Sequence, residues 1–456
     1  MSSTKGTLTD GPILKVLMKL AVPIMVSAFL STAYSITDMI WVGKLGAKVV
    51  AGVGVGGMYI WLSCGLSTLT KIGGQVYVGQ ELGAGKLEQA KKYACTAVWL
   101  TIFLGILFGL ISVFFTNSLV AFFGLDDPLA VDSAKVYIRI ACGLVVFQYL
   151  GVVLTGLYTA QGNSETPLKA NFLGLAINMI LDPLLILGIG PFPRLEGAGA
   201  ALATVIAQMI VVVTLIVFIQ KDKREENVLY GLQPWKKPEK KYLLEIIKMG
   251  GPVALQSSIY CGMSMILSRM ITAYGDAALA VQQVGGQIES ISWNTAEGFG
   301  SAMNAFAAQN YGAKEMKRIK KGYRISACFV FLWGGLVGAA FIFFPEAISN
   351  LFFHEAEAIM LSIAYFMIIG FSEAFMCLEL MAEGAIAGLG KTKLSSTISI
   401  VLTALRIPLA FALSKAGFGL NGIWIALAIS SVSKGIAMHI AFKRQFVSTK
   451  GYTIDN

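Results

Sequence analysis

Twelve apolar stretches, each near the length needed to cross a bilayer, constrain the fold of this 456-residue chain more than any other feature. A membrane-spanning helix needs about 20 mostly apolar residues. The composition agrees: 56% of the residues are hydrophobic and only 14% are charged, against roughly 25% charged in a soluble domain. The stretches are approximately 16–40, 49–75, 93–116, 133–157, 168–190, 197–220, 243–271, 279–306, 322–344, 358–386, 395–414 and 421–442.

The same stretches exclude a membrane barrel. Any segment that crosses lipid must satisfy its own backbone hydrogen bonds, which leaves helices and closed barrels. Barrel strands would show segments of about ten residues with alternating polarity, and the chain has no such pattern. The sequence therefore predicts an all-α integral membrane protein with twelve transmembrane helices.

Basic residues lie mainly in the loops on one side of the predicted spans. The loops on this side contain basic residues such as Lys86, Lys236 and Lys317. The loops on the opposite side contain few basic residues and carry the acids Asp126 and Glu346. Because cytoplasmic loops are enriched in Lys and Arg, we expect a multi-pass protein of the cell inner (plasma) membrane with both termini in the cytoplasm. The net charge of +10 is spread over these loops, so we expect no nucleic-acid partner.

Residues 23–92 recur 229 positions later as residues 252–321. The matches are rich in Gly and Pro, which mark special backbone geometry. Six spans per half place both halves in the same orientation, so they form parallel repeats related by a pseudo-two-fold axis along the membrane normal. We predict an N-terminal six-helix lobe (1–220), a polar cytoplasmic linker (221–242), and a C-terminal six-helix lobe with its tail (243–456). Matching pairs include Pro23 with Pro252, Gly46 with Gly275, Gly56 with Gly285, and Gln80 with Gln309.

Polar residues inside the spans of the first half indicate a functional site. A charged side chain at the bilayer centre is unfavourable by at least ~2.5–3.5 kcal/mol, so such residues are functional candidates by default. Asp38 and Asp182 are the acids of this half, and each follows a polar residue one helical turn earlier. The full set of candidates is Tyr34, Asp38, Asn171, Asn178, Asp182, Thr204 and Gln208.

Oxygen-rich side chains of this kind suit a hard cation or a proton. Burial favours the neutral form of a carboxylic acid, and two neighbouring acids oppose each other's ionisation. A structural interpretation also exists for both acids. Asp38 could lie at the membrane surface near Lys44, and Asp182 could be a helix-end residue before Pro183.

The second half carries different polar residues on the same framework. Leu267 takes the position of Asp38, and Ile407 takes that of Asp182. Its intramembrane candidates for substrate contact are Gln287, Glu289, Glu297, Glu379 and Glu383. Arg406 could neutralise one of these acids, so an ion pair and a substrate role both remain open.

Motifs for enzymatic or metal chemistry are weak. The glycines at 52–57 lie inside an apolar span without the Lys-Ser/Thr of a phosphate loop, so close helix packing explains them better. His354 and His439 lie far from any metal-binding spacing. We expect no enzymatic activity, no catalytic residue and no cofactor, and ion gradients as the energy source because the sequence lacks a Walker motif.

Several segments resemble the multidrug and toxic-compound extrusion (MATE) transporters over essentially the whole chain. The most specific are residues 79–90, after the second span, and 308–318, after the eighth. Thr37-Asp38 before Trp41, and Asn178 with Asp182-Pro183, also match. The resemblance implies a monomeric secondary antiporter that exports organic, often cationic drugs or toxic compounds in exchange for Na⁺ or H⁺.

The resemblance also implies roles for single residues. Asp38, Asn178, Asp182 and Thr204 look like the cation site of the bacterial and archaeal DinF-like branch, a possible Na⁺ site with Tyr34 beside it. Pro23 looks like the kink point of the first helix. Another branch has an acid in the seventh span, but residues 252–275 contain none. Glu379 and Glu383 lie near the tenth-span acid of that branch.

The mechanistic hypothesis is alternating access by two lobes. Cation and drug would oppose each other through contacts that differ between states. Binding of H⁺ or Na⁺ at Asp38 and Asp182 would remove negative charge, rearrange the first helix about Pro23 and weaken drug binding. Two rivals remain. One is a lipid-linked oligosaccharide flippase, for which Lys71 and Lys434 inside apolar spans leave room; the other is a channel or receptor, which the doubled lobes disfavour.

Overall fold

The computed structural model describes residues 8–224 and 227–447 of the chain. Within these residues all the regular secondary structure is helical, with no strand. The end of the predicted tail, 448–456, and residues 225–226 of the predicted linker lie outside the described residues. The fold class predicted from the apolar stretches is therefore confirmed.

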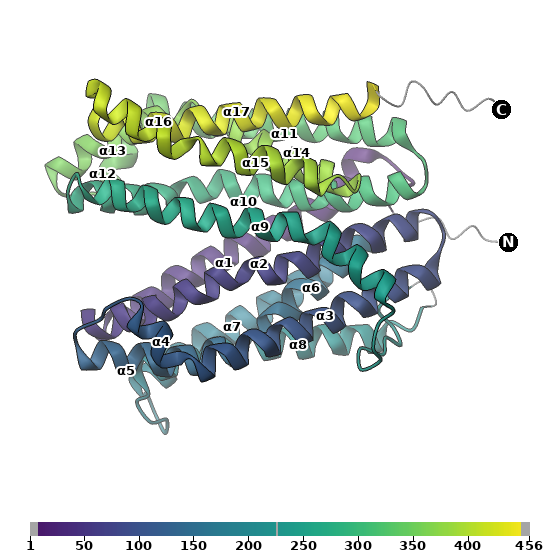
Figure 1. Ribbon diagram of the computed structural model, residues 1–456, viewed down its shortest axis with the longest axis horizontal. Helices are drawn as coiled ribbons and strands as arrows, with labels where there is room; N and C mark the ends of the chain where they lie inside the picture. Colours follow the sequence, from purple (N-terminus) through teal and green to yellow (C-terminus); the bar gives the residue numbers. More distant parts are fainter. Residues whose placement is uncertain (1–7, 225–226, 448–456) are drawn as a thin grey trace. The chain divides into compact units, whose positions relative to one another are not determined.

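The first repeat forms a series of helices that pack along one another (Figure 1). In this unit α2 packs against α3, α5 and α6, and α7 packs along α8. The helices are α1 (Ile13–Gly43), α2 (Ala47–Gly83), α3 (Leu87–Phe114), α4 (Thr116–Ala121), α5 (Pro128–Tyr137), the π-helical turn η1 (Ile138–Cys142), α6 (Val146–Ala160), α7 (Glu165–Leu187) and α8 (Glu196–Lys221).

The second repeat follows the same order. Here α10 packs along α14, which also contacts α11 and α17. The helices are α9 (Lys240–Thr272), α10 (Asp276–Gly312), α11 (Met316–Phe343), α12 (Pro345–Phe352), α13 (Ala356–Gly370), α14 (Glu373–Gly388), α15 (Thr392–Ala404), α16 (Arg406–Leu413), the π-helical turn η2 (Ser414–Phe418) and α17 (Gly419–Val447).

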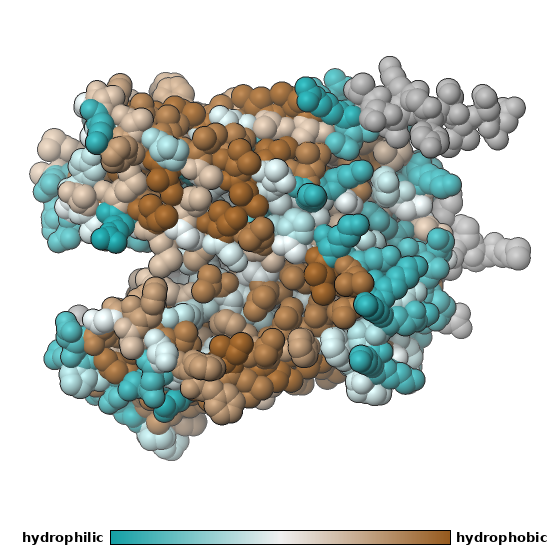
Figure 2. Space-filling view, in the orientation of Figure 1, coloured by the Kyte–Doolittle hydropathy of each residue, from teal (hydrophilic) through white to brown (hydrophobic). Residues whose placement is uncertain are grey.

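Each of the twelve predicted spans falls on one helix or on consecutive helices. By length and apolar composition, seven helical segments of the described chain qualify as spans, or nine when two bent pairs are included. One of the seven is a 55-residue stretch, Thr392–Phe446, that contains the last two predicted spans. The remaining two predicted spans, 243–271 on α9 and 279–306 on α10, are long enough to cross a membrane but are more polar. Figure 2 shows apolar side chains over the middle of the helices and hydrophilic ones toward their ends.

The repeat seen in the sequence is also a repeat of backbone geometry. Both α2 and α10 have 37 residues and begin after a glycine with positive φ, Gly46 (92°) and Gly275 (106°). Close helix contacts recur as well. A Cβ added at Gly109 would lie 2.5 Å from the carbonyl oxygen of Gly143, and one at Gly338 would lie 2.3 Å from that of Gly370. The matching glycines therefore build the same helix crossings twice.

The chain divides into two compact units whose boundaries cut through two long helices. Of the described residues, the first unit contains 8–10, 22–224 and 227–254, and the second contains 11–21 and 255–447. These boundaries differ from those of the predicted lobes because they divide α1 after Ala21 and α9 after Ala254. For α9 the contact with the first unit is tight, since a Cβ at Gly250 would lie 1.9 Å from the carbonyl oxygen of Leu69 on α2.

The predicted linker is less free than its polar composition suggests. Val228 and Leu229 belong to the apolar core of the first unit and are 0% and 1% exposed. The backbone N–H of Val228 donates to Oε1 of Gln161 at 3.0 Å. At the far end of the linker, Nζ of Lys92 on α3 donates to Oε1 of Glu239. The linker is therefore held against the first unit by two buried apolar residues and by these hydrogen bonds.

Candidate functional site

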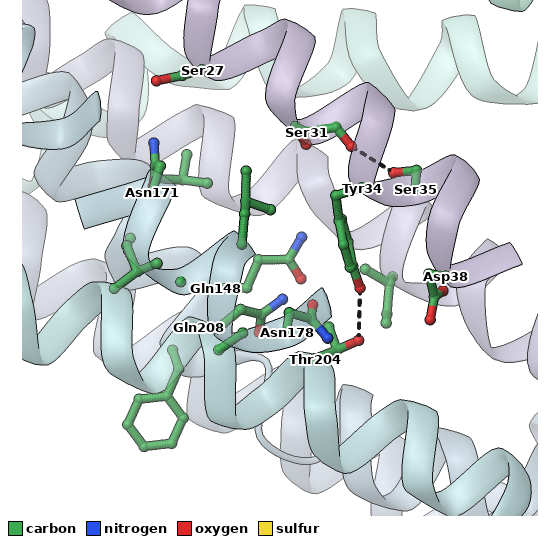
Figure 3. Close-up of a pocket in the computed structure, with 18 of the residues that line it drawn as sticks. Ser27, Ser31, Tyr34, Ser35, Asp38, Gln148, Asn171, Asn178, Thr204 and Gln208 are labelled. Carbon is green, nitrogen blue, oxygen red and sulfur yellow. Dashed lines mark hydrogen bonds between the residues drawn. The ribbon is translucent and has the colours of Figure 1, made fainter. Parts of the chain in front are cut away.

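One face of α1 borders a cavity of about 540 Å³ inside the first unit. Ser27, Ser31, Tyr34, Ser35 and Asp38 lie on this face at intervals of three or four residues, which places them above one another on the helix. The other walls come from α2, α5, α6, α7 and α8. Figure 3 shows these polar side chains of α1 facing amide side chains of the other helices.

Two side-chain pairs join the predicted residues near the cavity. The hydroxyl of Tyr34 lies 3.2 Å from Oγ1 of Thr204 and links α1 to α8 (Figure 3). Within α7, Nδ2 of Asn178 donates to Oδ1 of Asp182 at 2.8 Å, and both residues are buried. The spacing of four residues places this amide one turn from the carboxylate.

The two acids each keep an oxygen without a partner among the described residues. These atoms are Oδ1 of Asp38 and Oδ2 of Asp182, both shielded from solvent. The two carboxylates are close enough to interact electrostatically with each other, and both also act on Tyr34. Buried acceptors without donors are unfavourable unless something satisfies them. A proton or a hard cation would do so, and the oxygen ligands of the site suit either.

The site is not a cluster of acidic metal ligands. In the described part of the chain, no three His, Cys, Asp or Glu side chains come together in a way that could hold a metal ion. Any bound cation would therefore take oxygens from Asn178, Thr204, Tyr34 or the backbone in addition to the carboxylates. This donor set suits a weakly held monovalent ion better than a resident transition metal.

Several residues that line the cavity were harder to recognise from the sequence. Asn171 and Gln208, both predicted candidates, line it together with Gln148, Tyr137 and Lys71. Tyr137 and Gln148 come from α5 and α6 and have no acidic neighbour in the sequence to draw attention to them. The hydroxyl residues at 27, 31 and 35 could have been recognised from the sequence, because a spacing of four residues places them on one polar face of a helix.

The candidates of the second half lie outside this cavity. Glu289 accepts a hydrogen bond from Tyr365, and Glu383 accepts one from Nε2 of Gln256 at 2.9 Å. Gln287 and Glu297 are exposed. Glu373, an intramembrane acid that was not among the site candidates, is 1% exposed and accepts a hydrogen bond from Ser292.

Among the described residues Arg406 forms no direct ion pair with an acid, but it interacts electrostatically with Glu289, so its neutralising role stays a prediction. Its guanidinium donates to the hydroxyls of Ser430 (2.9 Å) and Ser431 (3.3 Å). The ion pair forms elsewhere: Nζ of Lys434 lies 2.7 Å from Oε1 of Glu379, with both side chains 5% exposed. Because α14 packs against α17, the side chain of Lys434, and not that of Arg406, reaches the carboxylate of Glu379.

Comparison with known proteins identifies the family. The family model described as MatE matches residues 23–184 and 252–412, one match for each repeat. This chain belongs to the MatE family. A second model, described as the lipid II flippase MurJ, matches only residues 123–274.

Full-length relatives agree with membership of the MatE family. The chain is 26% identical to the probable multidrug resistance protein YoeA of Bacillus subtilis over 407 residues, covering 89% of this chain and 88% of that protein. It is 25% identical to an FAD transporter of Shewanella oneidensis over 461 residues, covering 98% of each. The fold matches a crystal structure of a MATE protein in the straight conformation with a TM-score of 0.89 at 20% identity, covering 99% of each chain.

Proposed function

We propose that this chain is a secondary active antiporter that exports organic compounds, often cationic, in exchange for Na⁺ or H⁺. Membership of the MatE family and relatives named for multidrug resistance support the transport class. The observation that carries the ion coupling is the pair of acids Asp38 and Asp182, each with a solvent-shielded oxygen that has no hydrogen-bond partner among the described residues. The assignment to the DinF-like branch belongs to the same proposal.

Coupling follows from charge. When Asp38 is ionised, the cavity has negative charge for a cationic compound. Binding of H⁺ or Na⁺ removes that charge and weakens the compound's hold on the site, so the two ligands oppose each other. Tyr34 and Thr204 connect the acid-bearing α1 to α8, and α1 contains Pro23, where the helix lacks one backbone hydrogen bond and bends most easily. We propose that alternating access moves the two units in the inner membrane, with both termini cytoplasmic.

The test is dye efflux from proteoliposomes with one ion gradient imposed at a time. We expect Asp38→Asn and Asp182→Asn to lower gradient-driven efflux at least about 10-fold, since each removes an ionisable group that the coupling requires. Comparing a Na⁺ gradient with a pH gradient identifies the coupling ion. Asp132→Asn, which changes an exposed acid of α5 in the same unit, is the matched control.

Full efflux in both acid variants would exclude this site from coupling. A second candidate function is transport of a lipid-linked oligosaccharide, which the partial match to the flippase model favours. That function predicts movement of a fluorescent lipid-linked saccharide across the vesicle membrane without a Na⁺ or pH gradient. Movement of this lipid, together with dye efflux that does not depend on either gradient, would favour the flippase over the antiporter.

A further inference from the structure

Lys71 is a charged residue that lines the cavity, and the proposed ion coupling does not use it. It lies in α2, inside an apolar span, 12 residues before the helix ends at Gly83. At about 1.5 Å per residue this is roughly 18 Å from the end of the helix. A lysine at such depth is unfavourable by a few kcal/mol unless it serves a purpose. Its side chain lines the same cavity as Asp38.

The packing around Lys71 makes room for its side chain and provides no counter-ion. A Cβ added at Gly156 on α6 would lie 2.8 Å from Cγ of Lys71, so a glycine there leaves space for the lysine stem. Among the described residues no carboxylate lies within 4 Å of its ammonium. Lys434 of the second unit differs, because Glu379 closes it into a buried ion pair.

The positive and negative groups lie toward different ends of the cavity. Asp38 acts electrostatically on Tyr137, whose ring packs against Gly56 of α2. Lys71 follows Gly56 by 15 residues on the same helix, or roughly 22 Å of helix axis. Amide side chains of Gln148, Asn171 and Gln208 also line the cavity. The cavity therefore offers an acid, a set of neutral donors and acceptors, and a base.

We propose that Lys71 binds a carboxylate of the exported compound, so that the cavity selects zwitterionic organic molecules over purely cationic ones. The inference rests on the proposed function, since it requires this cavity to be the binding site for the exported compound. A single lysine balances a monoanion, whereas a phosphate dianion would leave charge unmatched in a low-dielectric site. The amide side chains suit the neutral polar groups of such a molecule.

A matched pair of dyes tests this preference. Rhodamine 110 carries a free carboxyl group, and rhodamine 123 is its methyl ester with the same chromophore. Binding of each to the purified full-length protein in lipid nanodiscs is measured by fluorescence polarisation. We expect Lys71→Met to weaken rhodamine 110 binding about 10-fold and to change rhodamine 123 binding less than about 3-fold, as for loss of one charge-assisted hydrogen bond. Lys71→Arg should retain most of the affinity for the acid.

The control is Lys221→Met, which removes an exposed lysine at the end of α8 in the same unit and should leave both affinities unchanged. Equal weakening of both dyes by Lys71→Met, or no effect on either, would overturn the proposal. So would a wild-type protein that binds the ester and not the acid. If the wild type binds neither dye, this inference fails, whereas the proposed function is decided separately by gradient-driven efflux from proteoliposomes.

Discussion

The two acids of the first unit have different surroundings. Asp182 is 0% exposed and does not line the cavity, and Asn178 holds one of its oxygens. Asp38 lines the cavity directly. In the proposed coupling, an ion that enters from the cavity would therefore meet Asp38 first, and Asp182 would act on it through its charge and through Asn178.

A different pair, Glu379 and Lys434, forms a buried ion pair in the second unit. Removing one partner of a buried ion pair leaves an uncompensated charge, which destabilises by about 3–5 kcal/mol. We expect Lys434→Met to lower the thermal unfolding temperature of the purified protein markedly, and the double variant Lys434→Met/Glu379→Met to recover most of the loss. Lys92→Met, which breaks the exposed pair with Glu239, should change little. A double variant no more stable than Lys434→Met would argue against the pair.

The sequence located some of these residues and missed their partners. Asn178 and Asp182 could be predicted together because a spacing of four residues fixes their contact on one helix. The partner of Glu379 could not, because Arg406 and Lys434 lie on different helices and only tertiary packing decides between them. From the sequence, Lys71 counted only as a residue that leaves room for a flippase, because the cavity that it lines is built from six helices far apart in the sequence.

At the scale of helices, close glycine contacts set the crossings. In α11, a Cβ at Gly338 would lie 2.3 Å from the carbonyl oxygen of Gly370, whereas one at Gly335 would meet nothing within 4 Å. We expect Gly338→Ala to destabilise the protein by about 1–3 kcal/mol, because the clash is with backbone that has no freedom to move. Gly335→Ala, three residues away, should be neutral or slightly stabilising. Thermal unfolding of both variants checks this. Equal unfolding temperatures for the two variants would contradict a close helix contact at Gly338.

Helix positions were predicted well and helix breaks poorly. Twelve apolar stretches were enough to place the helices, since length and polarity decide a span. The bends within two spans were not visible: α13 and α14 meet at 51°, and the α5–η1 segment meets α6 at 43°. The break between α15 and α16 at Leu405 was also missed. Such bends depend on packing and on which backbone groups find other partners.

At the scale of the whole molecule, the distribution of charged residues among the loops predicts the orientation in the membrane. None of the six cysteines forms a disulfide in the described part of the chain, so they can be replaced and single cysteines introduced for labelling. We expect a cysteine at Phe192, in the loop between α7 and α8, to react with an impermeant maleimide in intact cells. A cysteine at Lys236 should react only after permeabilisation, because its loop is rich in lysine. The opposite labelling pattern would invert the predicted topology.

The sharing of α1 and α9 between the units has a consequence for how such a chain could arise. Residues 11–21 belong to the first repeat and make their contacts in the second unit, while residues 240–254 belong to the second repeat and make theirs in the first. A gene for one repeat alone would encode a protein whose helix end lacks its packing surface. Two copies would satisfy both ends only by exchanging them, as in a swapped dimer. Fusion of duplicated genes would then make that exchange intramolecular.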